Sequence, residues 1–162
     1  MANIVRAPVH FRRRATTDRI SPQSLRPPPP IRGVVALRFE VRLWWAQARR
    51  DLRIGERNHQ HRDYEAAVFY CEQSVEKALK ALLMHRTGTP APRIHNLPEL
   101  GRLAGVDQAT LQFLTDLTPH YMISRYPDAA GAVTKDLYDG RMSLRFLRGS
   151  KEVLSWCRRR LR

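Results

Sequence analysis

Residues 63–83 read DYEAAVFYCEQSVEKALKALL and contain the clearest helical pattern of the chain. Apolar side chains recur there at intervals of three and four residues and form one broad face, which consists of Tyr64, Ala67, Val68, Cys71, Val75, Ala78, Leu79, Leu82 and Leu83. Asp63 is a suitable N-cap residue, and Gly88 ends the pattern. The spacing therefore predicts an amphipathic helix whose apolar face packs into a core.

A second helical pattern precedes this stretch. It begins at Leu37, is predicted to end near Gly55, and carries its apolar residues at helical spacing, namely Val41, Trp44, Trp45, Ala48 and Leu52. Residues 57–62, RNHQHR, are all polar, and we expect them to connect the two helices.

Two shorter helices are predicted after Gly88. Asn96 is expected to cap the first, because Pro98 lies in its first turn and Glu99 completes a capping box. The apolar side of this helix consists of Leu97, Leu100 and Leu103. Asp107 is expected to cap the second, which Pro119 interrupts and whose apolar side consists of Leu111, Leu114 and Leu117.

The C-terminal part of the chain predicts one long final helix, with a kink at residues 149–150 (Gly-Ser). Its apolar positions are Leu137, Tyr138, Leu144, Leu147, Val153, Leu154, Cys157 and Leu161. No segment alternates with a period of two for long enough to indicate a strand. We therefore expect an all-α fold, an antiparallel bundle of four to five helices.

Composition limits the class of protein further. No stretch approaches the roughly 18 uninterrupted apolar residues that a membrane span requires, and no apolar signal segment follows the N-terminus. A cytoplasmic protein is expected. The net charge is +14, with 22 basic and 14 acidic residues in 36–162, so that nucleic acid or nucleotide is an expected ligand. Because Arg outnumbers Lys by 25 to 4, coding bias is the alternative explanation.

Residues 1–35 are expected to be a disordered extension, and residues 36–162 the helical domain. The extension holds seven Arg, one Asp and four consecutive prolines at 27–30, which favour polyproline II over helix. Three interpretations stay open: a nucleic-acid-binding arm, a transit peptide, or a mis-assigned start in front of a domain that begins near residues 34–37. We favour the last, since the recognisable domain begins there.

Four segments, in order along the chain, resemble motifs of the HEPN family. Residues 63–83 resemble its signature helix, in which an aromatic residue and alanines precede Gln, Glu-Lys-Ala, Lys-Ala and paired leucines. Residues 45–52 (WAQARRDL) look like the opening helix of the family, and residues 95–100 (HNLPEL) are similar to its His-x-Leu-x-x-Leu. Residues 121–128 (YMISRYPD) look like the Tyr-x-x-x-Arg-Tyr-Pro-Asp segment of one prokaryotic branch.

This resemblance implies a helical bundle that usually forms a homodimer. It also implies a partner, because many members are encoded with a minimal nucleotidyltransferase and form toxin–antitoxin pairs. Many catalytic members are metal-independent ribonucleases that use an Arg followed four to six residues later by a His. Two such pairs across a dimer cleft could polarise a phosphodiester and move the proton of a ribose 2′-hydroxyl.

The ribonuclease motif is incomplete in this sequence. Arg125 corresponds to the Arg of the family, but no His follows it, and the last His of the chain is His120. Arg53 and His59 have the required spacing, yet they lie away from the position that the family uses, in a segment rich in Arg and His. Chance explains this match better, and the sequence leaves enzymatic activity open.

The candidate nucleotide- or phosphate-binding residues are Arg125, Tyr126, Asp128 and His95. Arg can form two parallel hydrogen bonds to a phosphate, Tyr can stack on a base, and Pro127 fixes the turn that presents them. The alternative is an ion pair between Arg125 and Asp128 that holds the turn. His95 could orient a phosphate, or it could be satisfied by local backbone hydrogen bonds.

The signature helix also carries a polar side, with Glu72, Gln73, Glu76, Lys77 and Lys80 at helical spacing. These residues form either a solvated face or, at Glu72, Gln73, Glu76 and Lys80, a partner or dimer contact. Cys71 and Cys157 lie on apolar stripes and are expected to be buried, inert thiols. No cluster with the spacing of metal ligands is present in the sequence, and we expect neither a metal nor a cofactor.

Two functions therefore compete. The preferred one is a nucleotide- or RNA-associated subunit that acts with a minimal nucleotidyltransferase, toxin–antitoxin-like, with an incomplete ribonuclease motif. The alternative is a non-catalytic dimeric helical adaptor that binds another protein.

Overall fold

The computed structural model describes residues 34–161, and within them it contains helices and no strands. The helices are α1 (Val34–Gln60), α2 (Tyr64–Thr87), α3 (Leu97–Ala104), α4 (Gln108–Leu117), α5 (His120–Ile123), α6 (Pro127–Ala130), the 3₁₀ turn η2 (Thr134–Leu137) and α7 (Gly140–Arg160). The all-α prediction is confirmed. The extension predicted for residues 1–35 lies outside the described residues, apart from its last two, which begin α1.

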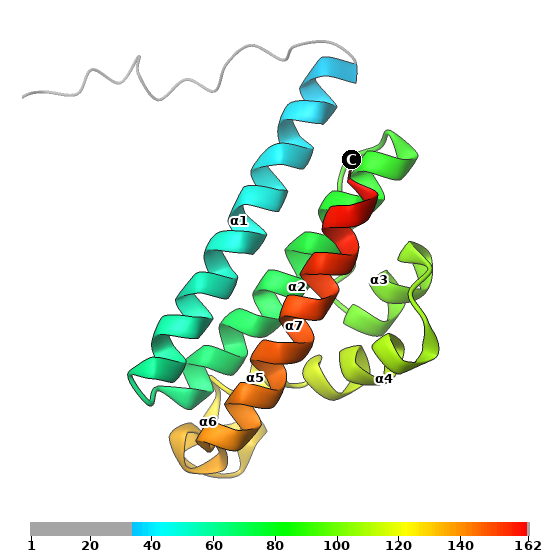
Figure 1. Ribbon diagram of the computed structural model, residues 1–162. Helices are drawn as coiled ribbons and strands as arrows, with labels where there is room; N and C mark the ends of the chain where they lie inside the picture. The colour runs from blue at the N-terminus through cyan, green and yellow to red at the C-terminus, as the bar shows by residue number, and fades with distance from the viewer. Residues whose placement is uncertain (1–33, 162) are drawn as a thin grey trace, which may run out of the picture. The chain divides into compact units, whose positions relative to one another are not determined.

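Three long helices, α1, α2 and α7, lie side by side (Figure 1). A short turn reverses the chain between α1 and α2, so these two helices are antiparallel, and Ser74 of α2 donates to the carbonyl oxygen of Ala48 in α1 at 2.8 Å. Helix α7 runs in the same direction as α2, because α3 to α6 bring the chain back to its starting end (Figure 1). Only α1 is therefore antiparallel to both of its long neighbours.

The prediction that the first helix ends near Gly55 is wrong, because α1 continues to Gln60. It also takes in most of the predicted polar connection, which shrinks to a turn around Arg62, whose φ is 66°. Gly55 is buried where the two helices cross, and a Cβ there would stand 3.1 Å from the carbonyl oxygen of Ala67. The glycine therefore permits close packing and does not end the helix.

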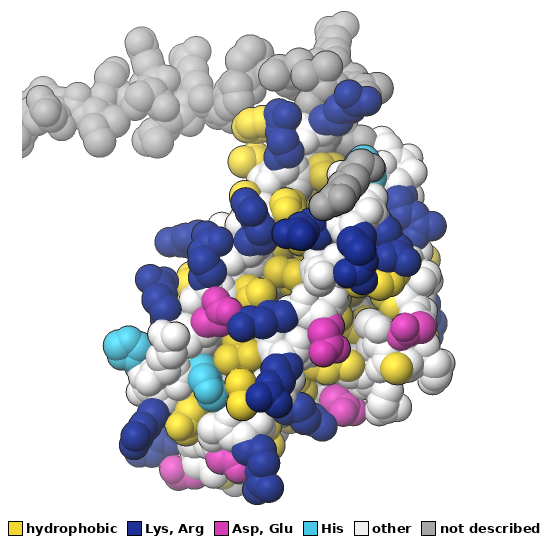
Figure 2. All heavy atoms as spheres, viewed as in Figure 1, with side chains coloured by type: hydrophobic (Ala, Val, Ile, Leu, Met, Phe, Trp, Pro, Cys, Tyr) yellow, Lys and Arg dark blue, Asp and Glu magenta, His cyan; other side chains and the backbone are white. Residues whose placement is uncertain are grey.

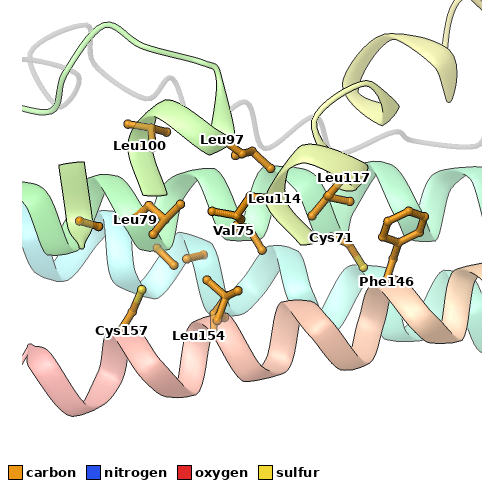
Figure 3. Packing of buried hydrophobic residues seen from close by; sticks show 14 of the residues in the cluster. Cys71, Val75, Leu79, Leu97, Leu100, Leu114, Leu117, Phe146, Leu154 and Cys157 are labelled. Carbon is orange, nitrogen blue, oxygen red and sulfur yellow. The ribbon is translucent and has the colours of Figure 1, made fainter. Parts of the chain in front are cut away.

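The signature helix α2 has the predicted ends. Gly88 follows it in the left-handed conformation (φ 68°), which closes the C-terminus. Asp63 occupies the N-cap position, but its side chain makes no capping hydrogen bond. In Figure 3, Val75 and Leu79 of α2 point toward Leu154 and Cys157 of α7 and toward Leu97 and Leu114 of α3 and α4. The apolar core therefore lies between α2 and the helices α3, α4 and α7.

Helices α3 and α4 start as predicted. The Asn96 side chain accepts a hydrogen bond from the Glu99 amide at 2.9 Å, and Asp107 accepts one from the Thr110 amide at 2.8 Å. The buried apolar residues of these helices include Leu97, Leu100, Leu114 and Leu117. Leu103 was predicted to join them, but it is 54% exposed, because the eight-residue helix turns only one side to α2.

The final helix begins later than predicted, at Gly140, where the Asp139 side chain accepts a hydrogen bond from the Met142 amide at 2.6 Å. Leu137 lies in η2 and Leu144 on the outer side of α7, so both are exposed, contrary to expectation. Cys157 on α7 and Cys71 on α2 are both buried free thiols, as predicted. Burial raises the pKa of each to about 12, so neither is nucleophilic at neutral pH.

Candidate functional site

The polar side of α2 lies inside the folded chain. Glu72 is 1% exposed, Glu76 6% and Lys80 3%, and Asp51 of α1 is buried beside them. We call this set the polar seam and define it as Asp51, Glu72, Gln73, Glu76, Lys77 and Lys80. Five of its six residues, all except Asp51, were predicted to be a solvated face or a partner contact. The chain itself covers Glu72, Glu76 and Lys80, and whether a partner also contacts the seam stays a prediction.

The seam is held together by a chain of polar contacts. Lys77 Nζ lies 2.9 Å from Asp51 Oδ2 and donates to Gln73 Oε1 at 2.7 Å. Gln73 in turn donates from Nε2 to Glu72 Oε2 at 2.9 Å. A second group begins at Lys80, whose Nζ donates to Glu76 Oε1 at 3.0 Å and lies 5.6 Å from the centre of the Trp44 ring. Buried charges need such partners, because an unpaired buried ion costs several kcal/mol.

Glu72 differs from the other carboxylates of the seam. Burial raises its pKa from 4.5 to about 7, although the hydrogen bond from Gln73 and the charges of Lys77 and Arg125 oppose the rise. The negative charge of Glu76 adds to the effect of burial. Glu72 therefore exchanges its proton near neutral pH, and the charge of Arg125 is among those that act on it.

Arg125 is exposed and lies among three aromatic rings. Its guanidinium carbon is 4.2 Å from the centre of the Tyr121 ring, 4.5 Å from that of Phe69 and 5.2 Å from that of Tyr126. Its Nε donates to the carbonyl oxygen of Tyr121 at 3.0 Å. Among the described residues no carboxylate forms an ion pair with it, so the alternative pair with Asp128 is not formed. We call Arg125, Phe69, Tyr121 and Tyr126 the Arg125 cluster.

The structure brings the other candidates together only in part. Tyr126 belongs to the Arg125 cluster, whereas Asp128 is an exposed residue in the first turn of α6. His95 lies at the other end of the seam, with Nδ1 3.1 Å from Glu76 Oε2, while 78% of its side chain is exposed. Its partner is thus a buried carboxylate and not the local backbone. Arg125 and His95 flank the seam but do not meet over one ligand.

The formal Arg–His match in α1 does not form a site. Arg53 is exposed, whereas His59 is half-buried and its Nδ1 lies 3.1 Å from Ser143 Oγ of α7. His120, five residues before Arg125, is also occupied elsewhere, because its Nδ1 lies 2.6 Å from Tyr138 Oη. Burial lowers the pKa of His120, so the ring is neutral at pH 7.

Phe69, Tyr121 and Asp51 all lie in the quoted motifs, but the sequence analysis did not name them as site residues. Tyr121 lies four residues before Arg125, a helical spacing that could have signalled the contact. Phe69 is 56 positions away from Arg125, and Asp51 is 26 away from Lys77, so no local signal exists for either.

Comparisons with known proteins agree with this architecture. A family model described as the HEPN domain matches residues 41–160. The crystal structure of TT1696 from Thermus thermophilus superposes with a TM-score of 0.68 at 26% identity, covering 75% of this chain and 98% of that one. ST0689, described as an archaeal HEPN homologue, superposes with a TM-score of 0.66 at 29% identity, with the same coverage of both chains. Among curated proteins none matches.

Within residues 34–161, no group of three or more His, Cys, Asp or Glu side chains is placed to hold a metal ion. None of the described helices combines the length and the apolar character that crossing a bilayer demands.

Proposed function

This chain belongs to the HEPN family, and from that premise we propose that it is an RNA-associated cytoplasmic subunit that acts with a nucleotidyltransferase. The observation that carries the RNA part of the proposal is the Arg125 cluster. An exposed guanidinium, oriented by the Tyr121 carbonyl and free of a described carboxylate partner, can bind a phosphate through its remaining N–H groups. Exposed rings of Tyr121 and Tyr126 beside it offer surfaces on which bases stack.

The distribution of charge supports the same ligand. Among residues 38–161, whose burial the structure describes, the buried acidic residues are Asp51, Glu72 and Glu76, and Lys80 is the one buried base. Folding therefore makes the surface more basic than the composition alone indicates. Figure 2 shows Lys and Arg side chains along α1 and α7 with few acidic ones between them. Such a surface gains affinity for a polyanion by releasing the counterions around its phosphates.

The proposal concerns binding without the usual ribonuclease chemistry of the family. No His follows Arg125 in the sequence, and His59 and His120 both have contacts of their own. The proton transfer that such a His performs in catalytic members thus has no evident carrier beside Arg125. We expect the wild-type protein to bind RNA without cleaving it in EDTA.

Partner contacts are proposed at α1. Phe39 and Leu43 are exposed on this helix, and a hollow of about 370 Å³ lies nearby, lined by Leu43, Trp44, Gln47 and Lys77. An apolar strip beside a polar seam suits a second copy of the chain, which would form the expected homodimer. Light scattering should then report a dimer at micromolar concentrations, and Leu43→Glu should shift it toward the monomer. A wild-type monomer would refute this part.

The nucleotidyltransferase partnership rests on the family resemblance. Its test is co-expression of the chain with the product of a neighbouring nucleotidyltransferase gene. Stable co-purification over two chromatographic steps would support it. A chain that elutes alone would leave RNA binding as the whole of the proposed function.

The RNA part is tested by titrating a labelled single-stranded RNA with the wild type and with Arg125→Ala. Loss of one charge-assisted, bidentate contact should weaken binding about tenfold or more. Arg125→Lys should restore only part of it, because an ammonium cannot form the two parallel bonds. Arg102→Gln, an exposed arginine of α3, is the matched control for charge. Equal losses in Arg125→Ala and Arg102→Gln would remove the cluster from the proposal.

A further inference from the structure

A groove between α4 and α7 lies away from both the polar seam and the Arg125 cluster. Its volume is about 480 Å³, and its lining includes Phe113 of α4 and Arg141, Arg145 and Arg148 of α7. We propose that this groove binds one nucleotide unit of single-stranded RNA, with the base against Phe113 and the phosphates on the arginines. This inference rests on the proposed RNA association and names a second, independent contact for it.

The aromatic floor of the groove depends on a glycine. A Cβ at Gly149 would collide with the ring of Phe113, so the missing side chain lets the ring lie directly on α7. The Phe146 ring stands behind it, with centroids 6.2 Å apart. Phe113 remains half-buried and lines two adjoining hollows, the second of about 260 Å³. A rigid ring that is open toward a hollow is what a stacked base requires.

The arginines form one wall of the groove. Positions 141, 145 and 148 are three and four residues apart, so their side chains leave the same side of α7. Arg141 and Arg148 are exposed and form no ion pair with any described residue. Arg145 Nη1 lies 3.5 Å from Asp116 Oδ2, and 60% of the Arg145 side chain is exposed. Solvent weakens such a pair, so a phosphate can replace the carboxylate.

The opposite end of the groove is acidic. Glu152 borders both hollows, and Asp107 borders the second one. Carboxylates accept hydrogen bonds from the amino groups of bases, whereas they repel phosphates. Basic and acidic ends on either side of one ring therefore match a nucleotide, which carries its phosphate at one end and base edge groups at the other. The volume lies within the range of about 300–1,000 Å³ that is typical of ligand sites.

The test compares two double variants of α7 in the full chain. Arg141→Gln/Arg148→Gln removes two charges from the groove, and Arg158→Gln/Arg159→Gln removes two charges from the same helix outside it. A fluorescent oligouridylate is titrated at several salt concentrations, and uridine monophosphate alone is titrated in parallel. The groove variant should bind the oligomer about tenfold more weakly, and the slope of log K against log salt should shrink by about 1.4, which corresponds to two phosphates on a single strand. The control variant should change the affinity for the oligomer and the salt slope much less.

A second pair of variants tests the ring. Phe113→Leu should weaken binding by about tenfold, whereas Phe113→Tyr should retain it, because every aromatic ring can stack. Thermal melts show whether Phe113→Leu is still folded; if it is not, the test rests on the Arg141→Gln/Arg148→Gln variant and its control.

The outcomes separate the two proposals. If the wild type does not bind the oligomer, the proposed RNA association fails and this inference fails with it. If the oligomer binds and both double variants weaken it equally, the groove is no site, while the Arg125 proposal stands. Binding of the monophosphate with no gain for the oligomer would overturn RNA as the ligand and indicate a free nucleotide.

Discussion

One side of α2 packs Val75, Leu79 and Leu82 into the apolar core, and its other side, equally buried, packs Glu72, Glu76 and Lys80 in the polar seam. Burying the apolar side stabilises the fold by about 25 cal/mol for each Å² of apolar surface that it removes from water. The polar side is stable only as long as every charge keeps its partner. One helix thus combines an apolar side that tolerates the loss of a little buried surface with a polar side that does not tolerate the loss of a charged partner.

The largest effect is expected from breaking an ion pair of the seam. Glu76→Ala removes the partner of Lys80, whose side chain is only 4% exposed, and should lower the free energy of unfolding by about 3–5 kcal/mol. Chemical denaturation of the wild type and of Glu76→Ala measures this difference in the free energy of unfolding. The double variant Glu76→Met/Lys80→Met should recover most of the loss, since it leaves no uncompensated charge. A double variant no more stable than Glu76→Ala would contradict this account of the seam.

The matched change on the apolar side is Leu79→Ala. Leu79 is completely buried, and its truncation leaves a cavity that should cost about 2–5 kcal/mol in the same assay. Leu79→Met, which nearly conserves volume, should cost less than about 1.5 kcal/mol. If Met proves as damaging as Ala, the core side has a shape requirement as strict as that of the seam.

A smaller effect is expected from Glu72 and depends on pH. Its folded pKa of about 7 lies above the unfolded value of 4.5, so the folded state holds the proton more tightly. The contribution of Glu72 to the free energy of unfolding therefore falls as pH rises from about 4.5 to about 7, by up to about 3 kcal/mol. Glu72→Gln stays neutral, and its stability advantage over the wild type should grow across that window and level off above it. Unfolding curves at pH 5, 6, 7 and 8 measure the difference, and a constant difference would disprove the raised pKa.

The smallest effect is expected from an ion pair outside the seam. Lys151 Nζ lies 2.7 Å from Glu56 Oε1, but 54% of the Lys151 side chain is exposed. Solvent screens this pair, so Lys151→Ala should cost less than about 1 kcal/mol in the assay used for Glu76→Ala. A loss comparable to that of Glu76→Ala would show that burial is not what distinguishes the seam.

The helix ends show how far local sequence goes. The caps at Asn96 and Asp107 were predictable because each side chain bonds an amide three residues away. The end at Gly88 was predictable for a similar reason, since a glycine in the left-handed conformation closes the last turn. Gly55 was wrongly interpreted as a helix end. The glycine is required because a side chain there would crowd the carbonyl oxygen of Ala67 on α2, a contact that the local sequence does not reveal.

The candidate site shows the opposite. Arg125 and Tyr126 were named as candidates from their motif, whereas Tyr121, which opens the same motif, was not named as a binding residue, and Phe69 lies 56 positions away. The groove beside Phe113 could not be predicted at all, because its lining comes from two helices and depends on the absence of a Cβ at Gly149. Sites of this kind are assembled from residues that are distant in sequence.

The sequence by itself determined the all-α class, the family, both ends of α2 and the starts of α3 and α4, because helical periodicity and capping hydrogen bonds act between residues no more than about four positions apart. Only the tertiary structure decided which polar residues are buried and which arginines face a groove. Glu72, Glu76 and Lys80 have the spacing of a solvated helix face, and they are buried because α1 and the segments after α2 pack over them. Such burial depends on contacts between distant segments, which the local pattern does not encode.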